Sequence, residues 1–420
     1  MAFLDRLKAH AQRRDTLAFF RYIGPGLLVT VGFIDPGNWA SNIAAGASFG
    51  YTLLWVITVS TLMLIVLQHN VAHLGIATGL CLSEAINRHF PPTASKLVLG
   101  TAIGASISTA LAEILGAAIG LRMLFPGLPL QAGASLAAAV VITMLFTNSY
   151  PKLERWIVAF VSLIGIAFLY ELHLVHVPWG QVAVGWIRPM FPSGSMLIIM
   201  SVLGAVVMPH NLFLHSEIIQ SRRWNLENEK VIGRQLKFEF ADTLFSMVLG
   251  WAINSAMIIV AAATFFGKAP VTEIEQAHNM LGPLAGSIAA LVFALALLLS
   301  GLSSSVTAGL AGSTVFAAFF GEEYDIRDLH SKLGAALTLV AATAAVFLVK
   351  NPFKALILSQ MVLSIQLPFT IVSQILLTSS PRVMGKHANT PRLRAVLWVV
   401  AAVVVALNLF LFAGFLRGHF

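Results

Sequence analysis

Two short motifs place ligand-type side chains inside long apolar stretches of this sequence. The first reads Asp-Pro-Gly-Asn over residues 35–38, and the second reads Met-Pro-His-Asn over residues 208–211. A carboxylate, an amide oxygen, a freed backbone carbonyl and a thioether together form a plausible cation site. Hard oxygen ligands accept almost any divalent ion, whereas a soft thioether favours transition metals over Mg²⁺ and Ca²⁺. This chemistry favours Mn²⁺ or Fe²⁺, with other soft divalent ions tolerated.

The spacing within each motif allows its ligands to share one site. Asp35 and Asn38 stand three residues apart, as do Ala205 and Met208, so each pair can lie on one helix face or cluster at an unwound turn. An aspartate inside a membrane is costly and by default indicates a function. A lone Met208 would ordinarily be core filler, but its place directly before Pro209 favours a ligand. The predicted metal ligands are Asp35, Asn38, the Ala205 carbonyl and Met208.

The composition shows which kind of scaffold must position these residues. Of the 420 residues, 58% are hydrophobic and only 10% are charged, with a mean hydropathy of +0.84. A soluble domain needs far more charge to cover its surface. Apolar runs near the roughly 20 residues needed to cross a bilayer recur from end to end. The sequence therefore predicts an all-α polytopic membrane protein with the lipid bilayer as its solvent.

The apolar runs and the Pro, Gly and charged residues between them predict eleven transmembrane helices. These spans lie near residues 22–46, 51–74, 96–124, 128–147, 155–174, 195–219, 238–266, 283–319, 333–349, 354–379 and 393–416. No segment is typical of a separate soluble domain, so we expect a single transmembrane domain over residues 1–420.

Prolines inside the first and sixth predicted spans should break both helices. Pro36 and Pro209 each lack an N–H donor and crowd the preceding turn. Backbone groups freed in this way are costly in lipid unless they line a cavity or bind something. Five spans separate the two breaks, which predicts a first repeat over 1–174, a second over 195–379 and an additional span over 393–416. Interrupted helices at matching places in two halves are typical of a transporter's central site; a single proline would usually only kink a packed helix.

The basic residues predict the orientation of the chain. With the N-terminus in the cytoplasm, most of the 26 Lys and Arg residues fall on the inner side. The opposite orientation would invert this bias. With eleven spans the C-terminus at Phe420 is then outside. The net charge of +8 is explained by topology, so we expect no nucleic-acid partner.

Several other classes of protein are disfavoured. There is no nucleotide-binding loop, zinc-protease motif or credible nucleophile triad, so we expect neither an enzyme nor a pump driven directly by ATP. No cofactor is predicted. The single cysteine, Cys81, excludes an intramolecular disulfide and is expected to be a small apolar filler.

The two proline motifs resemble the signature motifs of the Nramp family of divalent metal-ion transporters. Further similar segments are Gly-Ile-Ala-Thr-Gly at 75–79, Leu-Ala-Glu at 111–113, Leu-Phe-Leu-His-Ser at 212–216 and residues 358–369. The chain is similar to bacterial manganese transporters over nearly its whole length. The resemblance implies a leucine-transporter-like fold with inverted repeats and alternating access.

The resemblance also implies roles for individual residues. It implies metal ligation by the four groups named above and an approach of Gln360 to the ion in some states. It implies that His210 belongs to a proton or gating route near the metal and that Glu113 is associated with proton passage. The chain departs from the family where acidic residues are common: Ala110 and Ile103 stand at those places and cannot titrate.

Three hypotheses follow from the sequence. The first is a secondary importer of Mn²⁺ and Fe²⁺ coupled to H⁺. The second is an uncoupled, facilitative carrier of the same fold that also passes Mg²⁺; retention of Met208 argues against this branch. The third, ranked last, is a membrane sensor, since a sensor should carry a soluble output domain. Compact loops suit a prokaryotic inner membrane.

Overall fold

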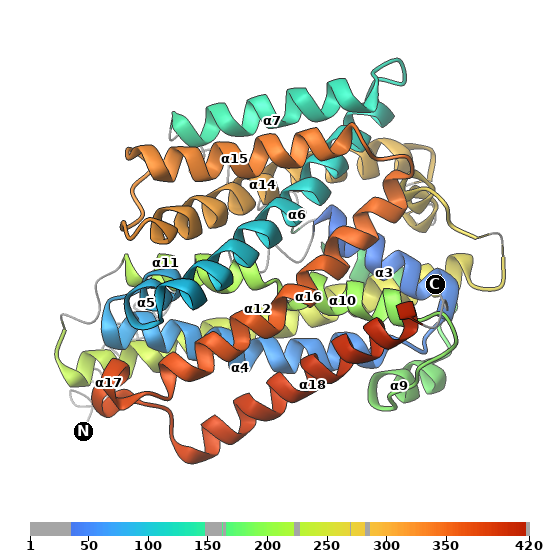
Figure 1. The fold of residues 1–420 in the computed structure, drawn as a ribbon. Coiled ribbons are helices and arrows are strands. Elements are labelled where there is room, and N and C mark those ends of the chain that lie inside the picture. Colours follow the sequence, from blue (N-terminus) through green and yellow to red (C-terminus); the bar gives the residue numbers. More distant parts are fainter. Residues whose placement is uncertain are drawn as a thin grey trace, which may run out of the picture.

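The computed structural model describes residues 35–147, 162, 165–221, 227–268, 270–281 and 286–416. Within these residues every regular element is a helix, and no strand is present. The helices run along a bundle, with several steeply crossed pairs (Figure 1). This confirms the all-α architecture predicted from the sequence.

The longer helices follow the predicted spans closely. Their bounds are α3 (Pro36–Phe49), α4 (Leu54–Thr78), α6 (Pro92–Leu124), α7 (Leu130–Phe146), α10 (Met196–Val207), α11 (Pro209–Gln220), α12 (Glu229–Phe265), α14 (Ala289–Phe319), α15 (Leu329–Val346), α16 (Pro352–Thr378) and α18 (Pro391–Leu416). Shorter elements are α5 (Leu82–His89), α9 (Trp179–Ile187), α17 (Pro381–Met384), η2 (Ile274–Leu281), η3 (Gly286–Ile288) and η4 (Gly385–His387).

Eight helical stretches of the described chain are long and apolar enough to cross a membrane, counting α10 and α11 as one stretch. The helices at Leu130–Phe146 and Gly165–Leu174 are apolar but shorter. Helix α3 is the described part of the first predicted span, whose residues 22–34 lie outside the described chain. Each of the eleven predicted spans thus has a helix at its place.

Two span boundaries differ from the prediction. Helix α12 begins at Glu229 instead of residue 238, because the Asn228 side chain accepts the Val231 N–H at 3.1 Å and caps the helix there. Helix α14 begins at Ala289, after the 3₁₀ turns η2 and η3. Hydropathy detects apolar residues. It therefore misses the polar start of α12 and counts the apolar turns before α14 as part of that helix.

Helices at matching places in the two predicted halves pack against each other. The third and eighth spans, α6 and α14, form the most extensive pair, and α4 packs against α12, α7 against α15 and α3 against α10. Figure 1 shows α6 and α14 crossing the bundle, with α7 and α15 along one flank. The pairing accords with an inverted repeat, while the division at residues 1–174 and 195–379 stays a prediction.

Helices α6 and α14 can approach closely because glycines, which have no side chain, lie at their contact. A Cβ on Gly301 would lie 2.5 Å from the Glu113 carbonyl oxygen, and one on Gly120 would lie 2.7 Å from the Ala294 carbonyl oxygen. Small residues at such contacts let helix backbones approach closely in a membrane protein. The backbone around Glu113 is therefore held firmly against the eighth span.

Candidate metal site

The sixth span breaks at Met208, as its proline predicts. Helix α10 ends at Val207 and α11 begins at Pro209, and Met208 between them has a φ of 43°. Among the residues that the structure describes, it is the only non-glycine residue with a positive φ. Proline has no N–H, so the Ala205 carbonyl lacks the amide that would follow four residues later in a helix. The break therefore frees a backbone acceptor one turn before Met208.

The described end of the first span begins at the other motif. Asp35 is the N-cap of α3: its Oδ1 accepts the Asn38 N–H at 2.6 Å, and its Oδ2 accepts the Asn38 side-chain amide at 2.8 Å. Both side chains are buried, with Asp35 only 3% exposed. The predicted pair at positions 35 and 38 thus clusters at one helix end, which is the local structure that a proline at N1 favours.

The two motifs lie on helices that contact each other. One turn beyond Asn38, the Ser41 hydroxyl lies 2.6 Å from the Ser201 hydroxyl of α10, one turn before Ala205. Ser201 in turn donates to the Ile357 carbonyl of α16 at 3.0 Å. These contacts tie α3, α10 and α16 together beside the breaks. Four ligand types that are far apart in the sequence are therefore carried by neighbouring helix ends.

Gln360 lies against both α3 and α10; the predicted break of the first span involves residues before Asp35, which lie outside the described chain. A Cβ on Gly37 would lie 2.0 Å from the Gln360 Nε2, and a Cβ on Gly204 would lie 1.9 Å from the Gln360 carbonyl oxygen. The glutamine therefore occupies space that only glycine leaves open on both α3 and α10. Its side chain is buried and has a long contact, 3.5 Å, to the Ser359 hydroxyl. This position accords with an approach of Gln360 to an ion at the breaks.

The Met208 thioether is oriented by a neighbour on the same helix. Asn211 donates from its side-chain amide to the Met208 sulfur at 2.9 Å and from its backbone N–H to the Met208 carbonyl at 2.9 Å. Met208 is 4% exposed. The spacing of three residues between Met208 and Asn211 is the sequence signal for such a contact.

His210 contacts the third span, and Glu113 lies on that span one turn from the contact. The His210 Nδ1 lies 3.0 Å from the Thr109 hydroxyl of α6. Glu113, one turn further along α6, hydrogen-bonds the Ser304 hydroxyl of α14 and is close enough to Asp35 to interact electrostatically. One carboxylate oxygen of Glu113, Oε2, is buried with no hydrogen-bond partner. The partners Thr109 and Ser304 have no local signal in the sequence, because a hydroxyl in an apolar helix does not show which residue of another helix it meets.

At two positions of α6 where the Nramp family commonly has acidic residues, this chain has apolar residues with apolar neighbours. Ala110 is fully buried and packs within an apolar cluster, and Ile103 is partly buried against another. Both residues lie on α6 with Glu113. Glu113 is thus the only acidic residue of this helix.

A buried polar network lies nearer one end of the bundle. The Glu239 carboxylate of α12 contacts His69 Nδ1 of α4 at 2.5 Å and His215 Nε2 of α11 at 3.5 Å. It also accepts the Thr243 hydroxyl at 2.8 Å. The pairing of His69 with Glu239 has no local signal, because 170 positions separate the two residues in the sequence. The network joins α4, α11 and α12, and its residue His215 lies on the helix that follows the break at Met208.

Comparison with known proteins agrees with this geometry. The family model described as natural resistance-associated macrophage protein-like (Nramp) matches residues 26–414. The divalent metal cation transporter MntH of Bradyrhizobium diazoefficiens is 40% identical over 96% of this chain and 91% of its own length. The MntH of a Nostoc species is 40% identical over 93% of this chain and 90% of its own length.

Solved structures agree with the fold. An Eremococcus coleocola manganese transporter superposes with a TM-score of 0.76 at 26% identity, covering 93% of this chain and 86% of its own. Mhp1, a nucleobase-cation-symport-1 family transporter, gives a TM-score of 0.62 at 18% identity, covering 93% of both chains. The second likeness shows the fold alone. Both accord with the expected leucine-transporter-like fold. On its sequence and its structure, the chain belongs to the Nramp family of membrane transporters and is a divalent metal cation transporter.

Proposed function

We propose that this protein imports Mn²⁺ and Fe²⁺ across a prokaryotic inner membrane by alternating access, with its N-terminus in the cytoplasm. One observation carries the proposal. Helices α3 and α10, which carry the two motifs, pack against each other, and Gln360 of α16 contacts both, at Gly37 beside Asn38 and at Gly204 beside Ala205. This arrangement offers hard oxygens together with a soft sulfur.

The chemistry of the ligand groups supports a transition-metal cargo. Asp35 carries the only formal charge among the four predicted ligands, so it supplies most of the attraction for a divalent cation. The Asn38 amide and the Ala205 carbonyl add neutral oxygens. The Met208 thioether adds affinity for Mn²⁺ and Fe²⁺ that it does not add for Mg²⁺ or Ca²⁺. The metal ion here is the transported substrate.

The buried position of the site supports alternating access. Asp35, Asn38 and Met208 are each no more than 4% exposed, so the ion must reach them through a rearrangement. Breaks in two matching helices are where a transporter of this fold can rock one group of helices against the other. We place the moving joint at Met208, where the helix hydrogen bonding is interrupted.

We further propose that H⁺ accompanies the metal by way of Glu113 and His210. Glu113 lies near Asp35, and His210 directly follows the break. A second candidate function is favoured by a specific observation: Ala110 and Ile103 leave α6 with one acidic residue. In that case the protein is an uncoupled carrier, which can also pass Mg²⁺.

Replacement of Asp35 tests the site itself. Asp35→Ala should abolish Mn²⁺ binding, measured by calorimetry on the purified protein, and Mn²⁺ uptake into proteoliposomes, because it removes the formal charge at the ion. Asp328→Ala is the matched control, since Asp328 is exposed before α15 and its side chain caps nothing. High-affinity Mn²⁺ binding retained by Asp35→Ala would contradict the site assignment.

A further inference from the structure

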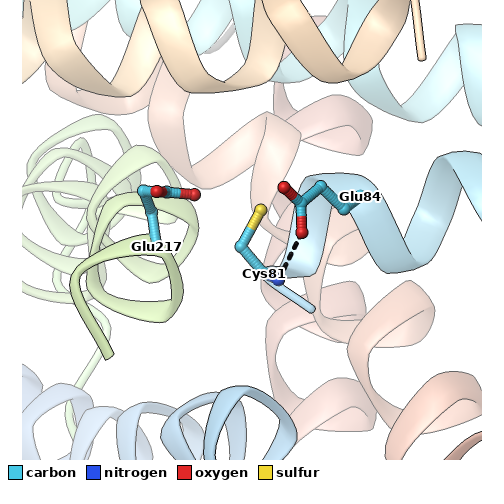
Figure 2. Close-up of side chains that lie close together, drawn as sticks. All are labelled: Cys81, Glu84 and Glu217. Atoms are coloured by element: carbon cyan, nitrogen blue, oxygen red, sulfur yellow. Dashed lines mark hydrogen bonds between the residues drawn. The ribbon is translucent and has the colours of Figure 1, made fainter. Parts of the chain in front are cut away.

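A cluster of metal-ligand side chains lies away from the central breaks. The Cys81 Sγ, one carboxylate oxygen of Glu84 and one of Glu217 all lie within 4.8 Å of one another. Figure 2 shows the two carboxylates on either side of the thiol. Cys81 precedes α5, Glu84 lies in its first turn, and Glu217 comes from the last turns of α11. Packing of α5 against α11 therefore assembles the cluster.

Helix capping explains only part of this arrangement. The Cys81 N–H donates to the Glu84 Oε2 at 3.0 Å, as in a capping box. The Gln220 amide donates to the same oxygen at 3.3 Å. The other carboxylate oxygen, Glu84 Oε1, is buried and has no hydrogen-bond partner. The cap thus leaves one oxygen of Glu84 available.

Glu217 supplies the stronger indication of a ligand. Glu217 is only 7% exposed, and its carboxylate oxygen Oε2 is buried with no hydrogen-bond partner. Figure 2 shows its carboxylate directed toward the Cys81 thiol. A buried carboxylate oxygen without a partner costs free energy unless a cation or donor satisfies it. The carboxylates of Glu84 and Glu217, each with one unsatisfied oxygen, thus flank the same thiol.

The two carboxylates, of Glu84 and Glu217, have no ion-pair partner in the part of the chain that the structure describes. The carboxylate of Glu323 is close enough to interact electrostatically with both Glu84 and Glu217. Burial, together with the charges of Glu217 and Glu84, raises the pKa of the Cys81 thiol, so without a cation the thiol keeps its proton.

Two cavities give the cluster a route to solvent. A cavity of about 780 Å³ is lined by Glu217, and another of about 270 Å³ is lined by Glu84. Glu322 and Glu323 line both cavities, which places the cluster between them. A small hydrated ion can therefore approach through a vestibule that is rich in carboxylates.

We propose that Cys81, Glu84 and Glu217 form a second metal site, for a divalent transition ion that accepts thiolate and carboxylate together, such as Zn²⁺, Co²⁺ or Fe²⁺. On binding, a metal–sulfur bond forms, the S–H bond breaks and the proton leaves to solvent. The thiolate disfavours Mg²⁺ and Ca²⁺. The site lies at the end of the bundle predicted to face the cytoplasm. It goes beyond the proposed transport function and is independent of Asp35.

The single cysteine of the chain makes a direct test possible. Co²⁺ is titrated into the purified full-length protein, and the thiolate-to-Co²⁺ charge-transfer absorption is followed. Because Cys81 is the only thiol, any such absorption belongs to this site. We expect the absorption in the unaltered chain and equally in Asp35→Ala, and we expect it to be lost in Cys81→Ser.

Carboxylate variants and a protection measurement complete the test. Glu217→Gln should weaken Co²⁺ binding at this site by about tenfold or more, whereas Glu322→Gln, which removes a charge from the same vestibule, should leave it nearly unchanged. Zn²⁺ should protect Cys81 of the unaltered chain from maleimide alkylation. Absence of the thiolate absorption at saturating Co²⁺, or equal binding by Glu217→Gln and Glu322→Gln, would overturn the proposal.

Discussion

At the scale of single residues, Met208 combines two properties that are normally separate. Its φ of 43° lies in the left-handed region, where a side chain costs about 1–2 kcal/mol relative to a helical conformation. Its sulfur is also the only soft group among the four predicted ligands of the central site. A glycine would satisfy the backbone better but would supply no sulfur. The presence of methionine here accords with a ligand role.

Two substitutions separate these properties. Met208→Ala and Met208→Gly both remove the thioether, but only glycine relaxes the backbone. If the sulfur is a ligand, both should lower the preference for Mn²⁺ over Ca²⁺ and Mg²⁺ by about tenfold, which corresponds to roughly 1.4 kcal/mol, and should lower total flux less. Competition uptake in proteoliposomes measures the ratio. An unchanged ratio in both variants would show that the thioether does not bind the ion.

At the scale of helices, the contact between α6 and α3 positions the first motif. A Cβ on Gly116 would lie 2.2 Å from the Pro36 ring, which is rigid and cannot move aside. Gly116 lies one turn beyond Glu113 on the same helix. The third span therefore contacts Pro36 of the first motif and also carries Glu113.

Gly116→Ala should therefore damage the site from a distance. Overpacking against Pro36 should destabilise the protein by roughly 1–3 kcal/mol and should reduce Mn²⁺ uptake. Gly104→Ala on the same helix is the matched control, because a Cβ there meets nothing within 4 Å and alanine favours a helix by up to about 1 kcal/mol. Thermal unfolding in detergent and uptake assays measure both. Equal behaviour of the two variants would contradict the proposed contact.

At the scale of the whole molecule, the single acidic residue of α6 raises the question of what drives transport. Mn²⁺ uptake into proteoliposomes that contain a pH dye should acidify the lumen if Glu113 and His210 suffice to pass a proton. Glu113→Gln should then abolish the acidification while retaining Mn²⁺ binding at Asp35. Uptake by the unaltered chain with no acidification would instead establish the uncoupled carrier, and strong competition by Mg²⁺ would extend its substrates.

The sequence predicted the features that depend on local chemistry. A proline removes an N–H wherever it stands, so the break at Met208 followed from one residue type, and hydropathy located the spans because lipid imposes one length on all of them. The place of Gln360 against Gly37 and Gly204 depends on how α16 packs and has no local signal. Cys81 was interpreted as filler because its partner Glu217 is remote in the sequence and becomes a neighbour only through folding.

The break at Met208 also divides the sixth span into two units anchored to different surroundings. Helix α10 is fixed to α16, where Ser364 donates to the Met200 carbonyl at 2.5 Å, whereas α11 packs mainly against α4 and α14. No continuous hydrogen-bond ladder joins them, so the two halves can open independently. Amide hydrogen exchange should therefore change abruptly at Pro209, with slow exchange along α10 and faster exchange along α11. Bound Mn²⁺ should reduce this contrast, because one ion held by ligands on both spans would link their local unfolding.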